Sequence, residues 1–339
     1  MDKRLDFLDS LKALGICLVI LYHCGYSPWD SLFIRGIYAI CVPLFFMVNG
    51  FLMLRKEYSI KNLLLKNLKL LFVLFFWAFV STAITMYTQK EWGNGFGSLR
   101  ILFFNSLFIG KPYCYHLWFL KAIFVLNVLN PILFSFIRGN EKRIYYLLVI
   151  LFLCSVRFFD RCVCRFTNPM MNWMTAFSVL YYILGYAMYN NSLKLNKLNK
   201  WHIIIMVLCF SILQWIYNWI LLDGPLASLN REKYWIIDLV WDGYNAPFVV
   251  LLTISVFLLF QKKQEWNNTF WSFIGSNSLP IYLMQSPIIA ICKSSLFYEQ
   301  LVTVYYPLRL ILPIVTLLIC VLLTWIFNKN KYTKWLISI

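Results

Sequence analysis

The sequence has little charge, and negative charge is especially scarce. Only 13% of its 339 residues are charged, about half the share in an average soluble protein, and 14 acidic residues stand against 31 basic ones. Hydrophobic residues make up 61% of the chain. A soluble fold needs polar side chains over its surface, and this chain has too few of them. The composition excludes a soluble globular enzyme, a disordered chain and a nucleic-acid-binding domain, and it indicates a membrane protein.

The basic residues are spread through short connections between apolar segments, as between Arg55 and Lys69. A nucleic-acid-binding domain would instead gather them on one folded surface. Their distribution is typical of the charge signal that orients membrane helices, and it also favours attraction to anionic lipid. A ligand rich in phosphate on the cytoplasmic side would suit it as well.

About 20 apolar residues are needed to cross the hydrocarbon core of a membrane. The sequence therefore predicts an all-α polytopic membrane protein, a bundle of about ten transmembrane helices in a single domain, 1–339. Asp238, Asp242 and Pro247 predict that the eighth span is broken or entered from a re-entrant turn, and the apolar segment 99–109 is too short to cross. The ten predicted spans are 10–26, 33–54, 68–88, 115–136, 144–159, 173–189, 202–222, 235–260, 269–292 and 308–328.

The positions of lysine and arginine predict the orientation of this bundle. With the N-terminus inside, 19 of the 31 basic residues lie in inside segments, 11 lie in outside segments, and Lys121 lies within the fourth span. This bias favours a cytoplasmic location for both termini. The first span is not followed by a small-residue cleavage site, so we expect it to remain as a helix.

The ten cysteines do not indicate a disulfide scaffold or a metal centre. Most of them fall inside apolar segments, where cysteine behaves as a small hydrophobic residue. No Cys-x-x-Cys pair occurs with a matching histidine spacing. We therefore expect no metal and no permanently bound cofactor.

Two polar residues of the first span are candidates for a functional site. Lys12 and His23 are eleven residues apart, which is roughly 16 Å along one helix. Eleven residues at 100° each leave the two side chains only about 20° apart around the axis. Polar groups inside a membrane are costly, so each is a candidate for function. The alternatives are a helix–helix hydrogen bond for His23 and a lysine that reaches the inner interface for Lys12.

Other polar residues are predicted near the depth of His23. They are His116 at the outer end of the fourth span, Gln285 in the outer half of the ninth, and Asp238 and Asp242 at the start of the eighth. Each of these could instead be an ordinary interfacial residue. Asn49, Gly50 and Arg55 lie near the inner end of the second span, where Gly50 and Pro43 favour close packing or a kink.

Four segments, in order along residues 4–290, resemble the acyltransferase-3 family of integral membrane acyltransferases. Asp9-Ser-Leu-Lys-Ala13, followed by His23, resembles the opening of that family. Phe45-Phe-Met-Val-Asn-Gly-Phe-Leu52 resembles its Phe-Phe-x-x-Ser-Gly-Phe-Leu, and His116-Leu-Trp-Phe-Leu120, with Pro131, resembles a third segment. Tyr282-Leu-Met-Gln-Ser-Pro287 resembles its Tyr-Leu-x-His-x-Pro.

The sequence departs from these motifs at three positions. Lys12 replaces the commoner arginine, which keeps the charge but loses the bidentate geometry for phosphate. Asn49 replaces a serine. Gln285 replaces a histidine, so it forms hydrogen bonds but takes no part in proton transfer at neutral pH.

The resemblance implies transfer of an acyl group, usually acetyl, from cytoplasmic acetyl-CoA to a hydroxyl of a glycan or lipid-linked sugar, in a bacterial cytoplasmic membrane. It implies His23 as general base or acyl carrier, with His116 beside it in the catalytic set. Lys12, Arg55 and Asn49 would bind the acyl-CoA. Gln285, Asp238 and Asp242 would bind the acceptor or the oxyanion. The alternatives are a transporter of a polysaccharide or lipid-linked sugar and a scaffold of a polysaccharide-synthesis complex.

Overall fold

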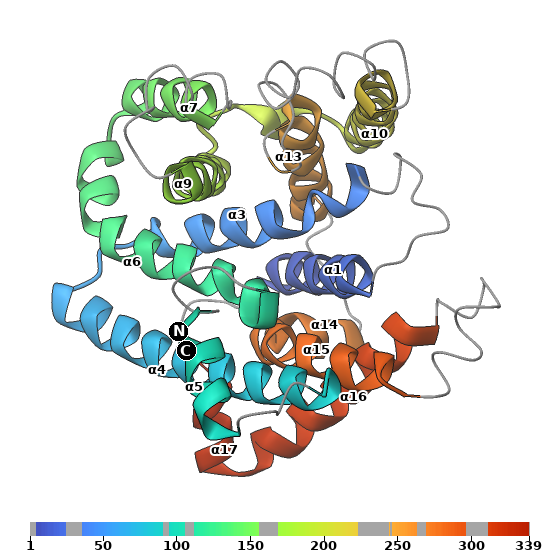
Figure 1. Ribbon diagram of the computed structural model, residues 1–339. Coiled ribbons are helices and arrows are strands. Elements are labelled where there is room, and N and C mark those ends of the chain that lie inside the picture. Colours follow the sequence, from blue (N-terminus) through green and yellow to red (C-terminus); the bar gives the residue numbers. More distant parts are fainter. Residues whose placement is uncertain are drawn as a thin grey trace. The chain divides into compact units, whose positions relative to one another are not determined.

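The computed structural model describes residues 5–24, 36–90, 95–105, 112–155, 169–222, 244, 246–262, 269–295 and 311–338. Over these ranges the chain is helical and contains no strand (Figure 1). The all-α class is therefore confirmed. The chain forms two compact units. Unit 1 comprises residues 1–15, 29–58 and 125–275, and unit 2 comprises residues 16–28, 59–124 and 276–339.

Each unit draws its helices from separate parts of the chain, and three helices contribute residues to both units: α1 (Asp6–His23), α6 (Trp118–Ile137) and α14 (Thr269–Ser276), of which only Ser276 belongs to unit 2. The other helices of unit 1 are α3 (Cys41–Met53), α7 (Glu141–Ser155), α9 (Pro169–Tyr189), the 3-10 helix η3 (Leu195–Lys197), α10 (Lys200–Leu222) and α13 (Pro247–Lys262). The other helices of unit 2 are α4 (Ile60–Thr88), α5 (Phe96–Phe104), the 3-10 helix η2 (Pro112–Leu117), α15 (Ser278–Lys293), α16 (Ile311–Lys329) and α17 (Lys331–Leu336).

Each of the ten predicted spans contains a helix, but the boundaries differ. Among the described residues, five helices are long and apolar enough to cross a membrane: 36–53, which includes α3, and α4, α6, α10 and α16. The sequence predicts the ninth span as one helix, and here the structure differs, because α14 ends at Ser276 and α15 begins at Ser278. α13 begins at Pro247, where the sequence predicts a break. Ten crossings remain a prediction.

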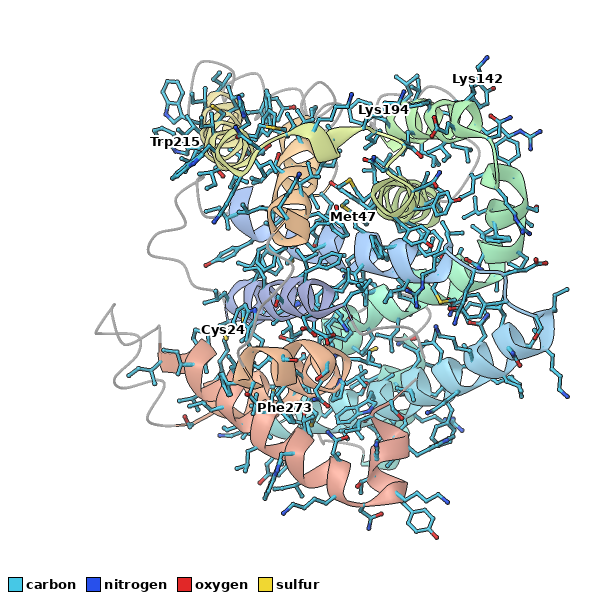
Figure 2. All side chains as sticks on the ribbon, turned by 180° about the vertical axis from the view of Figure 1, so that it is seen from behind. Cys24, Met47, Lys142, Lys194, Trp215 and Phe273 are labelled. Carbon is cyan, nitrogen blue, oxygen red and sulfur yellow. The ribbon has the colours of Figure 1, made fainter. Side chains whose placement is uncertain are left out.

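Apolar side chains cover much of the surface of the longest helices. On α10, Trp201, Leu208, Trp215 and Trp219 are exposed, and Trp215 projects from the outer side of the helix in Figure 2. Exposed apolar surface on this scale is unfavourable in water and favourable against lipid chains. The long helices therefore fit an integral membrane protein.

Two glycines form the centre of unit 1, where α3 crosses α9. A Cβ atom on Gly50 would lie 1.8 Å from the Tyr182 carbonyl oxygen, and one on Gly185 would lie 1.9 Å from the Met47 carbonyl oxygen. The backbones approach this closely only because neither glycine has a side chain. Beside this crossing, the Tyr182 hydroxyl donates a hydrogen bond of 2.6 Å to Asn130 Oδ1.

Three segments predicted to face the cytoplasm gather at one end of unit 1. Arg138 pairs with Glu57 at 3.4 Å, and the Tyr145 hydroxyl donates a hydrogen bond to the Ser192 carbonyl. Figure 2 shows Lys142 and Lys194 at this end. The first contact joins the turn after α6 to the turn after α3, and the second joins α7 to the turn after α9. That this end faces the cytoplasm remains a prediction.

In unit 2, α15 packs against α4 and α16, and η2 also packs against α4. The chain turns back after α16 and forms α17, a short helix that the sequence did not predict. The Trp77 indole donates a hydrogen bond of 3.0 Å to the Leu336 carbonyl, so the C-terminal residues are held against α4. These contacts place the elements that carry the candidate site of unit 2.

Candidate functional site

Three polar candidate residues of unit 2 lie on α1, η2 and α15, and we refer to them with the Tyr282 contact that joins η2 to α15 as the cluster of unit 2. His23 is the last residue of α1, His116 lies in η2, and Gln285 lies within α15. The sequence predicts a functional role for each of the three. All of them belong to unit 2, so their environments are described together.

His116 is buried, with 4% of its surface exposed, and its position is held by α15. The Tyr282 hydroxyl donates a hydrogen bond to the His116 backbone carbonyl, and the two rings lie 6.1 Å apart. The backbone of η2 leaves helical geometry at Cys114 (φ −131°, ψ 28°), just before His116. Along the described chain, the His116 Nε2 atom has no hydrogen-bond partner.

Gln285 is fully buried, and neither its amide oxygen nor its amide nitrogen has a hydrogen-bond partner within the described ranges. Buried polar groups in proteins are nearly always hydrogen-bonded, and an unsatisfied one costs about 1–3 kcal/mol. A side chain with both a donor and an acceptor, held at this cost in an apolar interior, is suited to binding a polar group. Tyr282 precedes it by three residues, so both project from neighbouring positions on one face of α15.

His23 is half-buried at the end of α1, and its ring meets the Tyr22 ring edge-on at 5.4 Å. His23 lies within range of electrostatic interaction with His116 and with the ammonium of Lys293. The two predicted histidines therefore belong to the same unit, within the distance over which their charges interact.

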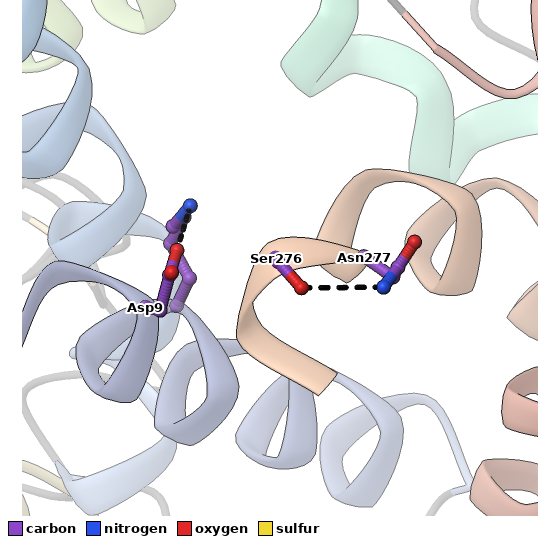
Figure 3. Close-up of polar contacts among 4 residues, drawn as sticks. Asp9, Ser276 and Asn277 are labelled. Carbon is purple, nitrogen blue, oxygen red and sulfur yellow. Dashed lines mark hydrogen bonds and ion pairs between the residues drawn. The ribbon is translucent and has the colours of Figure 1, made fainter. Parts of the chain in front are cut away.

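The predicted acyl-CoA residues lie in unit 1. Lys12 forms an ion pair of 2.6 Å with Asp9, one turn earlier on α1 (Figure 3). α14 approaches α1 closely here, since a Cβ on Gly275 would lie 1.8 Å from the Asp9 carbonyl oxygen. The ammonium of Lys12 is therefore held by a carboxylate, and the side chain remains 23% exposed.

Asn49 and Arg55 are half-buried. Asn49 directly precedes Gly50 of the helix crossing, and Arg55 lies in the turn that follows α3. The crossing therefore determines where the Asn49 side chain is presented. Asp238 and Asp242 lie outside the described residues.

Sequence reasoning missed two residues of the cluster in unit 2. Tyr282 looks like an ordinary aromatic residue of an apolar helix, although its position three residues before Gln285 places it on the same face. From the sequence, Lys293 is only one of the 11 basic residues predicted in outside segments. In both cases the signal is a long-range contact, which no local pattern indicates.

The class of protein follows from these observations: an α-helical integral membrane protein with a buried polar cluster between its helices. The comparison with protein families is more specific. The acyltransferase-3 family, described as an acyltransferase domain, matches residues 5–327. The chain belongs to this family. No curated protein and no solved structure matches it.

Proposed function

We propose that this membrane acyltransferase is an O-acyltransferase that moves an acetyl or other acyl group from cytoplasmic acetyl-CoA to a hydroxyl of a cell-envelope glycan or lipid-linked sugar. The observation that carries the proposal is the cluster of unit 2, where Tyr282 of α15 holds the buried His116 and the buried amide of Gln285, three residues further along α15, has unpartnered atoms among the described residues. A hydroxyl nucleophile needs a base, and a thioester carbonyl under attack needs hydrogen-bond donors.

In this proposal His23 is the general base. Its imidazole takes the proton of the acceptor hydroxyl while the hydroxyl oxygen attacks the thioester carbonyl. The tetrahedral intermediate collapses with cleavage of the carbon–sulfur bond, and the imidazolium returns the proton to the CoA thiolate. A route through acetyl-His23 needs the same residue as nucleophile.

Gln285 and His116 stabilise the reacting groups. The Gln285 amide nitrogen donates to the oxyanion, or its oxygen accepts from the acceptor sugar. The Tyr282 hydrogen bond holds the backbone at His116 and so positions that imidazole. Asp238 and Asp242 remain candidates for the acceptor side.

The acyl-CoA enters from the cytoplasmic side, where Lys12, Asn49 and Arg55 bind its phosphates and polar groups. Lys12 and His23 are on one continuous helix, roughly 16 Å apart by the rise per residue. This length is comparable to that of the pantetheine arm. The ion pair with Asp9 orients the Lys12 ammonium and makes the pair neutral as a whole. A phosphate of the acyl-CoA therefore competes with Asp9 for this ammonium.

The experiment uses purified protein in liposomes with acetyl-CoA labelled in the acetyl group and a crude glycolipid extract. We expect His23→Ala to lower label transfer by about 10²–10⁴-fold, the usual contribution of a general base, while acetyl-CoA binding is retained. His202→Ala is the matched control, because His202 is exposed near the start of α10. Full transfer by a folded His23→Ala protein would exclude both routes.

The transporter alternative is separated by CoA dependence. A carrier moves its substrate without acetyl-CoA, whereas the transferase is inactive without it. Appearance of the acetyl label in the glycolipid, matched by release of an equal amount of free CoA, supports the transferase. Transport of sugar without CoA consumption by the wild-type protein would overturn it.

A further inference from the structure

α4 is longer than a membrane crossing requires. Its 29 residues extend about 43 Å, against a hydrocarbon core of about 30 Å. All its charged residues, Lys61, Lys66 and Lys69, lie in its first third, and the 19 residues 70–88 carry no charge. The apolar part alone is long enough to cross, so the first turns of α4 extend beyond the core into the headgroup region.

These first turns combine lysines with exposed apolar residues. Ile60, Leu64, Leu65 and Leu68 are all exposed, as is Lys61. A helix in water would bury these leucines, whereas a helix at a lipid interface keeps them among the outer parts of the acyl chains. Lysine side chains there extend their ammonium groups toward the lipid phosphates.

The C-terminal residues add to the same surface. Lys69 Nζ donates a hydrogen bond of 3.0 Å to Ser338 Oγ, and the Phe72 and Trp335 rings lie 4.8 Å apart. These contacts hold α17 beside the charged part of α4. Tyr332 is 82% exposed and Trp335 is 45% exposed, as interfacial aromatic residues are.

The charged residues of these two segments are all basic. Residues 59–88 and 311–339 contain six lysines and no aspartate or glutamate. The lysine–aromatic surface is defined by Lys61, Lys66, Lys69, Lys331, Tyr332, Lys334 and Trp335.

We infer that the lysine–aromatic surface is a binding site for the headgroups of anionic phospholipids. Charge complementarity selects an anion, and the exposed leucines and aromatic rings select a lipid surface over a phosphate compound dissolved in water. The inference is independent of the acyl-transfer chemistry, because it uses none of the residues assigned to the cluster or to the donor. The bound lipid would join α4 to α17.

The test compares binding of phosphatidylglycerol and phosphatidylcholine by the full-length protein purified in detergent, with bound lipids counted by native mass spectrometry. The variant is Lys61→Gln/Lys331→Gln/Lys334→Gln, three exposed lysines. The control is Lys194→Gln/Lys197→Gln/Lys200→Gln, which removes the same charge from three exposed lysines of unit 1. A third protein is Lys61→Arg/Lys331→Arg/Lys334→Arg.

Each lysine near an anionic surface contributes about 1 kcal/mol, or about fivefold. We therefore expect the glutamine variant to bind phosphatidylglycerol at least tenfold more weakly, with phosphatidylcholine unchanged. The control and the arginine variant should bind as the wild type does. Equal losses of phosphatidylglycerol binding in the glutamine variant and the control, or unchanged binding by the glutamine variant, would overturn the inference. Displacement of phosphatidylglycerol by acetyl-CoA would also overturn it, by assigning the lysines to a soluble ligand.

Discussion

The crossing of α3 and α9 gives a prediction whose size follows from the geometry. In Gly50→Ala the new methyl group would lie 1.8 Å from the Tyr182 carbonyl oxygen, whereas observed Cβ contacts are essentially never under 3.0 Å. The helices must therefore separate by about 1.2 Å. The obstacle is backbone, so no side-chain rotation relieves it. Forced repacking of this kind costs about 1–3 kcal/mol, and we expect a loss of stability at or above that range.

Gly185→Ala creates the reciprocal clash with Met47 and is expected to cost a similar amount. One separation of the two helices relieves both clashes. The double variant should therefore lose less stability than the sum of the single variants, with a coupling of about 0.5–3 kcal/mol. Independent sites would add within about 0.5 kcal/mol.

The assay is thermal unfolding in detergent, followed at one scan rate by tryptophan fluorescence and by the fraction of protein that stays monodisperse. Gly97→Ala is the matched control, because Gly97 lies exposed in α5 and a Cβ added to it would meet no atom within 4 Å. Alanine has the higher helix propensity, so the control should be neutral or slightly stabilising. Unchanged unfolding temperatures for both Gly50→Ala and Gly185→Ala would refute the packing argument. So would full additivity in the double variant.

Three further outcomes are expected. Tyr282→Phe leaves the buried His116 carbonyl without its donor, which should cost about 1–3 kcal/mol in thermal unfolding and lower kcat for acyl transfer more than it raises KM. Trp77→Phe removes the hydrogen bond to the Leu336 carbonyl, so carboxypeptidase should trim the C-terminus faster than in the wild type. Gln285→Leu removes two unsatisfied buried atoms and should preserve or raise the unfolding temperature while acyl transfer falls; a drop in stability with full activity would contradict this.

Much of the fold could be predicted from the sequence, because membrane helices are encoded by local hydrophobicity. Every predicted span contains a helix, and the interruption at Pro247 coincides with the start of α13. The division between α14 and α15 falls at Asn277, within Gly275-Ser-Asn-Ser278, a group of turn-forming residues that the prediction of one span over 269–292 passed over. The length of α4 was underestimated because its first turns mix leucine with lysine, a pattern that lowers hydropathy but preserves a helix.

The packing partners could be predicted only in part. The sequence identifies Gly50 as a position for close packing, and the structure supplies its partner, Gly185. Choosing that partner requires the arrangement of α3 and α9, which depends on contacts between residues far apart in the chain. The same reason explains why the candidate site could be predicted only in part. The sequence identifies the histidines individually, whereas Tyr282 and Lys293 belong to the site only through the packing of α15 in unit 2.

Gln285 stands where the motif Tyr-Leu-x-His-x-Pro has histidine, and this limits which residues of the proposed site can transfer a proton. An amide neither gains nor loses a proton near neutral pH, so this position acts through hydrogen bonds alone. Both amide atoms are buried without partners among the described residues, which is unfavourable for stability and therefore consistent with a binding role. In the proposed mechanism, proton transfer therefore falls to the histidines of the same unit. Of these, His116 is enclosed and held through its backbone by Tyr282, while His23 is half-buried at a helix end beside the Lys293 ammonium. His23 combines a titratable ring with access for a substrate, and this makes it the residue whose removal tests the mechanism most directly.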